Sequence, residues 1–110
     1  MSRLKSLLAS AACLAASLPA AGQEGGDTPE MRAALAAGYK AAFTCSATFN
    51  AGQSMAEIEA NELSGIYPDY RDAFEAVSDP LINDQARTVS VSYRRSMPPR
   101  IAAYRPGLGC

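Results

Sequence analysis

The first 22 residues carry the pattern of an export leader, which leaves 88 of the 110 residues to form a fold. Arg3 and Lys5 supply the positive start, residues 7–16 supply an apolar stretch, and Ala20-Ala21-Gly22 offers small residues for cleavage before Gln23. The apolar stretch is shorter than the roughly 20 residues of a membrane-spanning helix, and no later segment is a better candidate. We therefore expect an exported chain, periplasmic or secreted, without a transmembrane segment.

A lipid anchor is the alternative use of this leader, with Cys13 as the acylated residue. The preceding Ser10-Ala11-Ala12 lacks the leucine expected at the third position back, and Cys13 would cut the apolar stretch short. A cleaved export signal over residues 1–22 fits the pattern better.

Two cysteines remain in the exported part, Cys45 and Cys110. Exported proteins meet an oxidising environment, so an even pair first predicts a disulfide. Such a bridge would close a loop of about 66 residues and stabilise the fold by about 4 kcal/mol, because it restricts the unfolded chain. A redox-active or nucleophilic cysteine is the other interpretation, but the chain has no His and no C-x-x-C spacing to activate a thiol.

The exported part carries eight basic and eleven acidic residues, a net charge of −3. Nucleic-acid binding needs a basic patch or stripe, and attraction to anionic lipid needs positive charge, so this balance argues against both. Eighty-eight residues make one small domain with a thin core. No partner can be named from the composition.

The first half of the exported part predicts a helix followed by a strand. Residues 23–37 read as a flexible leader and a short helix, with Pro29 at its first position and Gly38 as its stop. From Tyr39 to Asn50 apolar and polar residues alternate, which is typical of a strand with Cys45 on its apolar face.

The second half predicts short helices and a strand pair. Ser54 and Glu57 match a capping box, which opens a helix ending near Gly65. Residues 67–70 resemble a turn, and residues 70–77 are expected to form a helical turn or two. Thr88–Tyr93 and Arg100–Tyr104 predict an antiparallel pair.

With Tyr39–Asn50 as the third strand, the expected fold class is α+β, a small three-stranded antiparallel sheet with one or two short helices. In such a sheet Cys45 would lie close to Cys110, the residue that follows the last strand.

No catalytic residue, cofactor or metal site emerges from the sequence. Without His there is no Ser-His-Asp triad and no histidine ligand, and no Gly-rich phosphate loop is present. Serine–lysine hydrolysis needs S-x-x-K, but the only lysine of the exported part, Lys40, has Ala37 at the serine position. The one match, Ser2 to Lys5, lies in the leader.

Three other groups of residues resemble catalytic or binding sites, but a structural role explains each of them better. Glu57, Glu59 and Glu62 form an acidic, solvated helix surface, because an acid–base pair needs a pocket that separates two pKa values. A solvated hairpin end accounts for Arg94, Arg95 and Arg100, although they could also bind an anion. Turn residues account for two near matches to a Y-x-N motif, Tyr67-Pro68-Asp69 and Tyr70-Arg71-Asp72.

From about Ala37 to Cys110 the chain carries an ordered set of short motifs: Gly38-Tyr39-Lys40-Ala41, Thr44-Cys45-Ser46-Ala47 with Phe49, Gly52, Glu59 with Glu62-Leu63, Asp84 with Ala86-Arg87-Thr88-Val89-Ser90-Val91, and Ala103-Tyr104-Arg105-Pro106-Gly107-Leu108-Gly109-Cys110. This set resembles the N-terminal region of exported serine hydrolases of the β-lactamase-related superfamily, which includes class C β-lactamases, D-alanyl-D-alanine carboxypeptidases and 6-aminohexanoate-dimer hydrolases. The Tyr-Arg-x-Gly-Leu-Gly-Cys ending is the most specific of these motifs.

The resemblance implies that residues 38–110 precede a catalytic domain with S-x-x-K, Y-x-N and K/H-x-G motifs, none of which this chain matches. It also implies a Cys45–Cys110 bridge. The chain is then expected to be an inactive N-terminal fragment of a larger α/β serine hydrolase, with an apolar sheet face left uncovered and the missing catalytic domain as its partner. The alternative is a stand-alone exported module, stapled by the disulfide, that binds a partner.

Overall fold

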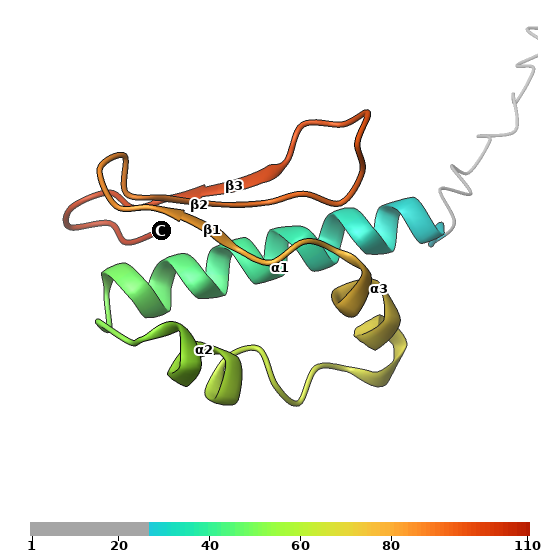
Figure 1. The fold of residues 1–110 in the computed structure, drawn as a ribbon, viewed down its shortest axis with the longest axis horizontal. Helices are drawn as coiled ribbons and strands as arrows, with labels where there is room; N and C mark the ends of the chain where they lie inside the picture. Colours follow the sequence, from blue (N-terminus) through green and yellow to red (C-terminus); the bar gives the residue numbers. More distant parts are fainter. Residues whose placement is uncertain (1–26) are drawn as a thin grey trace, which may run out of the picture.

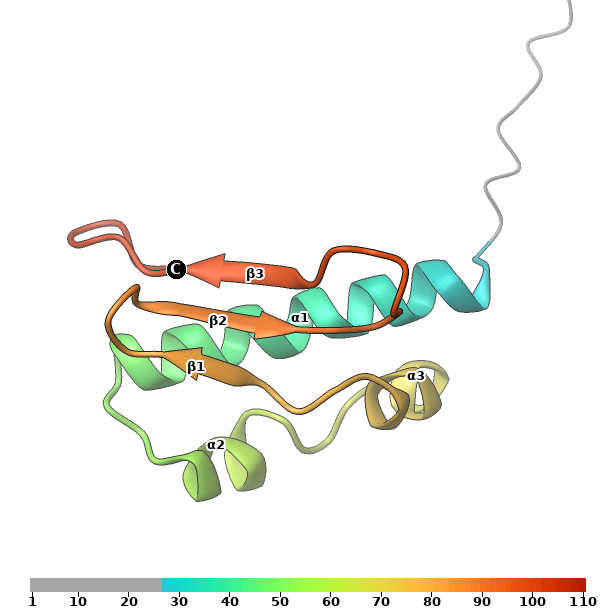
Figure 2. The same ribbon diagram turned by 45° about the horizontal axis from the view of Figure 1, so that its top comes forward.

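A computed structural model describes residues 27–110. The elements follow in the order α1 (Pro29–Phe49), α2 (Met55–Asn61), a short 3-10 helix (Pro68–Tyr70), α3 (Arg71–Ala76), β1 (Leu81–Asn83), β2 (Thr88–Val91) and β3 (Arg100–Ala103). The strands form one antiparallel sheet in the order β1-β2-β3, and α1 lies between this sheet and the two short helices (Figures 1 and 2). The predicted α+β class with a small three-stranded antiparallel sheet is confirmed.

The prediction of a strand over Tyr39–Asn50 was wrong, because these residues continue α1. Seven alanines lie in this helix, and alanine has the highest helix propensity. The alanines also explain the error. Alanine is small enough to lie on a buried or an exposed face, so an alanine-rich segment fits the two-residue period of a strand and the 3.6-residue period of a helix equally well. The helical period appears in burial: Ala37, Ala41 and Cys45 are four residues apart and nearly inaccessible to solvent.

The predicted stop at Gly38 was also wrong, so the boundary expected between residues 37 and 38 falls inside α1. A glycine that ends a helix normally adopts a positive φ, and Gly38 does not. The helix begins as expected, with Pro29 in its first turn and the Thr28 hydroxyl accepting a hydrogen bond from Met31 N at 3.1 Å. It ends at Phe49, and Gly52 takes the positive φ of +68°.

The sheet contains the predicted strand pair and one strand that the sequence pattern missed. β2 and β3 pair with Val89 opposite Ala102, which confirms the predicted antiparallel pair. The third strand is β1, which pairs with β2 and places Ile82 opposite Val89. Three residues between Pro80 and a turn are too few for an alternation to be recognised.

The two faces of the sheet differ. Val89 and Val91 are fully buried on the face that packs on α1. The cross-strand row Leu81, Ser90 and Ile101 is one residue out of step with them and points the other way, since side chains alternate along a strand. One face of the sheet is therefore covered by α1, and the other is not covered by any part of residues 27–110.

The short helix α2 begins with the predicted capping box. Ser54 N donates to Glu57 Oε2 at 2.7 Å, and Glu57 N donates to Ser54 Oγ at 3.4 Å. The backbone N–H of Ser54, and after it the Ser54 hydroxyl, lower the pKa of the Glu57 carboxyl. A single fully buried side chain, Ile58, anchors α2, and Phe74 anchors α3. The helical turns predicted over residues 70–77 are confirmed by α3.

Small side chains dominate the core. It consists of Ala36, Ala37, Ala41, Cys45, Phe74, Val77, Val89 and Val91. Alanines on α1 let the valines of β2 approach the helix closely, so the α1–sheet contact closes without large side chains.

Candidate functional site

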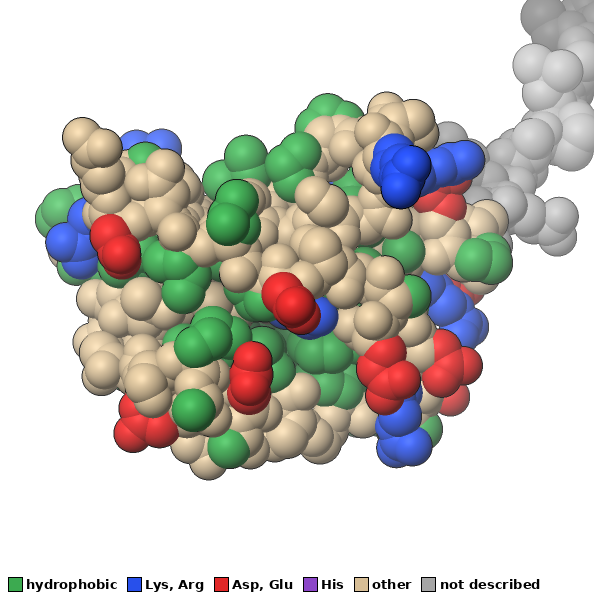
Figure 3. All heavy atoms as spheres, viewed as in Figure 1, with side chains coloured by type: hydrophobic (Ala, Val, Ile, Leu, Met, Phe, Trp, Pro, Cys, Tyr) green, Lys and Arg blue, Asp and Glu red, His purple; other side chains and the backbone are tan. Residues whose placement is uncertain are grey.

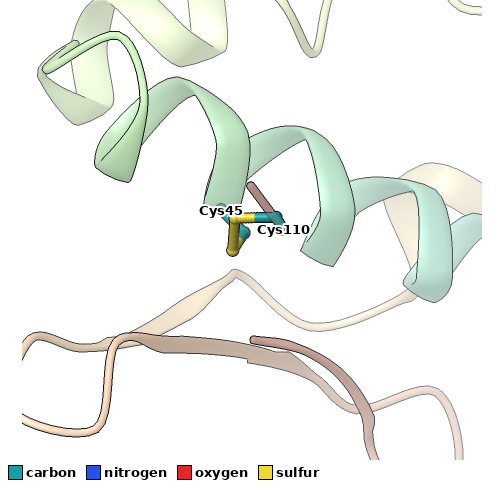
Figure 4. The surroundings of a disulfide bond; sticks show 2 residues. All are labelled: Cys45 and Cys110. Atoms are coloured by element: carbon teal, nitrogen blue, oxygen red, sulfur yellow. A yellow bond between two sulfur atoms is a disulfide. The ribbon is translucent and has the colours of Figure 1, made fainter. Parts of the chain in front are cut away.

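The disulfide joins Cys45 to Cys110, with their Cα atoms 6.1 Å apart (Figure 4). Cys45 is fully buried near the C-terminal end of α1, whereas Cys110 is exposed. The bridge therefore links the central helix to the segment that follows β3. The sequence interpretation placed Cys45 on a neighbouring strand, and the observed fold replaces that strand with the helix beneath the sheet.

Lys40 is buried beside α3 and the loop that precedes β1. Its Nζ donates to the backbone carbonyl of Ser78 at 3.3 Å and lies 4.7 Å from the centre of the Phe74 ring. Burial lowers the pKa of this amine, and the nearby Asp79 carboxylate opposes that effect. A lysine with a lowered pKa can act as a base.

No serine hydroxyl is bonded to Lys40 among the described residues. The hydroxyl of Ser78 instead donates to Asp79 O and accepts from Ser92 N, both on the backbone. The lysine thus fixes the loop between α3 and β1 to the helix, and Ser78 fixes the same loop to the end of β2. This arrangement is a structural clamp without a nucleophile–base pair.

An open apolar groove of about 520 Å³ lies between α1 and the chain that connects α2 to α3. Aromatic and aliphatic side chains of α1, of the connection and of α3 line it, together with Gly65: Leu35, Ala36, Tyr39, Ile66, Tyr67, Tyr70 and Phe74. Hydrophobic side chains are visible on this face of the molecule, between α1 and the connection (Figure 3). The volume is within the range of small-molecule sites, and the lining favours an apolar ligand or side chain.

The sequence interpretation missed this groove. Tyr67 and Tyr70 were interpreted as turn residues, and they do belong to a turn, since the 3-10 helix spans Pro68–Tyr70. The same turn also brings both side chains into the lining of the groove, to which Tyr39 contributes from α1. Tyr39 is itself stacked on Phe43, with 4.1 Å between ring centres. The available signal was three aromatic residues, Tyr67, Tyr70 and Phe74, that follow Ile66 within eight positions. A search for the two-residue period of strands or the 3.6-residue period of helices does not detect this signal.

The acidic residues of α2 do not converge on a pocket. Glu57 belongs to the capping box, and Glu62 accepts a hydrogen bond from Gln53 Nε2 at 3.2 Å. Glu59 is exposed. Each carboxylate thus has a local structural role or faces solvent.

The arginines at the β2–β3 loop also have local contacts. Arg94 pairs with Glu30 at the start of α1. Arg100 lies over the Tyr93 ring, 5.4 Å from its centre, and Arg95 is exposed. One of the three charges is thus neutralised by Glu30, which weakens the anion-binding interpretation.

A second apolar area lies on the sheet face away from α1. Leu81 is 71% exposed and Ile101 is 65% exposed, on either side of Ser90 in the same cross-strand row. With the groove, this gives the molecule apolar surface on two opposite sides.

No family model, characterised protein or solved structure matches this chain.

The described part of the chain contains no metal centre and no membrane span. No group of three or more His, Cys, Asp or Glu side chains within residues 27–110 is placed to hold a metal ion. Within the same residues, no helix has both the length and the hydropathy to cross a membrane. The groove and the outer face of the sheet both expose apolar side chains that a ligand or another protein could contact.

Proposed function

We propose that this chain forms the N-terminal region of an exported β-lactamase-related serine hydrolase and packs through its apolar surfaces against the catalytic part of that enzyme. The enzyme would hydrolyse an amide or ester through an acyl-enzyme on its serine. Residues 27–110 would contribute structure and no catalytic group.

The observation that carries the proposal is the uncovered sheet face. Leu81 and Ile101 expose most of their surface in one row, while the opposite face of the same sheet is closed by α1. Exposed apolar patches usually mark contact sites, because leaving them in water is unfavourable. The open face carries Leu81 and Ile101 beside the polar Ser90, and this exposed apolar surface suits a contact with another layer of the same protein.

The motifs that resemble the hydrolase family lie where the fold is built. Gly38–Ala41 and Thr44–Ala47 belong to α1, residues 88–91 form β2, and residues 103–110 run from the end of β3 to the disulfide. These motifs thus make up the helix–sheet contact. A shared helix–sheet unit, with catalytic motifs elsewhere, is consistent with the proposal.

Covalent capture tests the proposal in the producing cells. A biotinylated fluorophosphonate labels active serine hydrolases, and denaturation with reduction then separates chains that are not covalently joined. Trypsin should release Thr88–Arg94 from this chain, and we expect that peptide in the captured fraction. Labelling should disappear when unlabelled fluorophosphonate is added first. Finding the peptide only in the uncaptured fraction would overturn the proposal.

Recombinant residues 23–110 provide the matched control for the second half of the proposal. This piece should remain unlabelled by the same probe, because no described serine is paired with a base. Stoichiometric labelling would show that the chain carries its own nucleophile.

The second candidate function is a stand-alone exported binding module. It is favoured by the disulfide and by a core that the described residues form among themselves. Its signature is a natural product whose intact mass equals residues 23–110 less two hydrogens, with no labelling in the cells. The apolar groove and the Leu81–Ile101 row would then be its contact surfaces.

A further inference from the structure

The segment of residues 105–110 is folded on itself. Arg105 N donates to Gly109 O at 2.7 Å, and Gly109 N donates to Arg105 O at 2.9 Å. Leu108 N also donates to Arg105 O, and the Leu108 side chain is 83% exposed. The segment therefore buries little apolar surface, and its backbone hydrogen bonds do not reach α1.

The residue before this segment is held in a different way. Tyr104 N donates to Arg87 O at 2.9 Å. The Arg87 guanidinium lies over both the Tyr104 ring, 4.2 Å from its centre, and the Phe49 ring of α1, 5.2 Å from its centre, and the two ring centres are 5.9 Å apart. The chain is thus fixed up to Tyr104 by contacts of several kinds. Beyond Tyr104, the bond from Cys110 to Cys45 is the strong link to the helix.

We propose that the Cys45–Cys110 disulfide is a redox-controlled tether, whose reduction releases residues 105–110 from α1 while the helix–sheet unit stays folded. Two features support local release. Cys45 sits in the core as a small apolar side chain and keeps this role as a free thiol. Tyr104 holds β3 in place without the bridge.

The reductant is a dithiol, and the exposed partner is the one it reaches. Its thiolate attacks the Sγ of Cys110, the S–S bond breaks, and Cys45 leaves as a thiolate that takes up a proton. The second thiol of the reductant then attacks the mixed disulfide and releases the Cys110 thiol. Two electrons pass to the protein, and the dithiol becomes a disulfide. Oxidation after export runs in the opposite direction and closes the tether.

Hydrogen exchange of the exported chain tests this inference, in the oxidised form and after treatment with dithiothreitol, well below the melting temperature of the reduced form. We expect exchange of the Arg105 and Gly109 amides to rise by at least about tenfold. The amides of Val89 and Val91 should still exchange more slowly than those of Arg105 and Gly109, although the lower global stability of the reduced form speeds their exchange as well. Unchanged exchange at residues 105–109 would overturn the inference, and so would loss of protection throughout the sheet.

A double variant, Cys45→Ala with Cys110→Ser, separates the disulfide from other effects of the reductant. It should show the fast exchange of the reduced form without any reductant, and dithiothreitol should not change it. A response of this variant to dithiothreitol would contradict the assignment of the switch to this bridge.

Discussion

The two sides of α1 are packed in different ways. On the sheet side, Ala37, Ala41 and Cys45 meet Val89 and Val91, and all five are nearly or fully buried. On the side of the short helices, Leu35 and Tyr39 remain half exposed beside the groove. Small side chains of α1 against β-branched side chains of the sheet pack closely, whereas the larger Leu35 and Tyr39 on the other side of α1 border an open groove. Stability should therefore depend on the first side and ligand or partner contact on the second.

Removal of the disulfide, which joins α1 to the segment after β3, should have one of the largest effects on stability. For Cys45→Ala with Cys110→Ser, we expect the free energy of unfolding to fall by about 4 kcal/mol, since the unfolded chain is no longer restricted by a long loop. Urea denaturation of the variant and the oxidised wild type measures the difference. A loss below about 1 kcal/mol would show that the bridge contributes little to the stability of the fold.

Ile58→Ala tests whether the side of α1 that faces the short helices also contains a tightly packed contact. Ile58 is fully buried, so truncation should cost about 2–5 kcal/mol through lost transfer energy and a cavity. Ile101→Ala is the matched control, since Ile101 is 65% exposed and its truncation should change stability by less than about 0.5 kcal/mol. Equal effects of the two substitutions would contradict the described burial.

Lys40→Met tests the clamp between α1 and the loop before β1. Because the amine has a lowered pKa in the folded chain, the unfolded chain binds more protons between that pKa and the ordinary value of 10.5. The stability of the wild type should therefore rise with pH across this window, by at most about 1.4 kcal/mol per pH unit for one proton. The variant lacks this component. Denaturation curves at several alkaline pH values give the difference, and parallel pH profiles would refute the effect.

Gly38→Ala should give the smallest effect, and it should stabilise the protein. Gly38 lies inside α1 with a negative φ, and a Cβ there would meet no atom within 4 Å. Alanine should raise the free energy of unfolding by about 0.5–1 kcal/mol. Gly65→Ala is the matched control, because Gly65 has φ +68° and its substitution should cost about 1–2 kcal/mol. A loss on Gly38→Ala would mean that another layer approaches α1 at this residue.

Local signals that depend on neighbouring residues were predictable. The capping box at Ser54 and Glu57 was found because its two side chains bond to backbone groups within the same turn. The β2–β3 pair was found because Val89 and Val91 alternate with polar residues over a full strand. The start of α1 was found from Thr28 and Pro29, which satisfy or avoid the free N–H groups of a first helical turn.

The errors came from segments where local preference was ambiguous. Residues 39–50 fit a strand as well as a helix, and β1 was too short to be recognised. The groove could not be predicted either, since Tyr39 and Tyr67 are far apart in sequence and line one groove only when α1 and the α2–α3 connection pack together.

The sequence by itself determined the acidic balance, the α+β class, the caps and the β2–β3 pair, because each depends on composition or on contacts within a few residues. Tertiary structure alone decided that residues 39–49 are helical, which strand completes the sheet, and which apolar side chains stay exposed. The reason is burial. An alanine-rich segment becomes a helix when one face of it can close against β2, and Leu81 and Ile101 are exposed because α1 covers the opposite face.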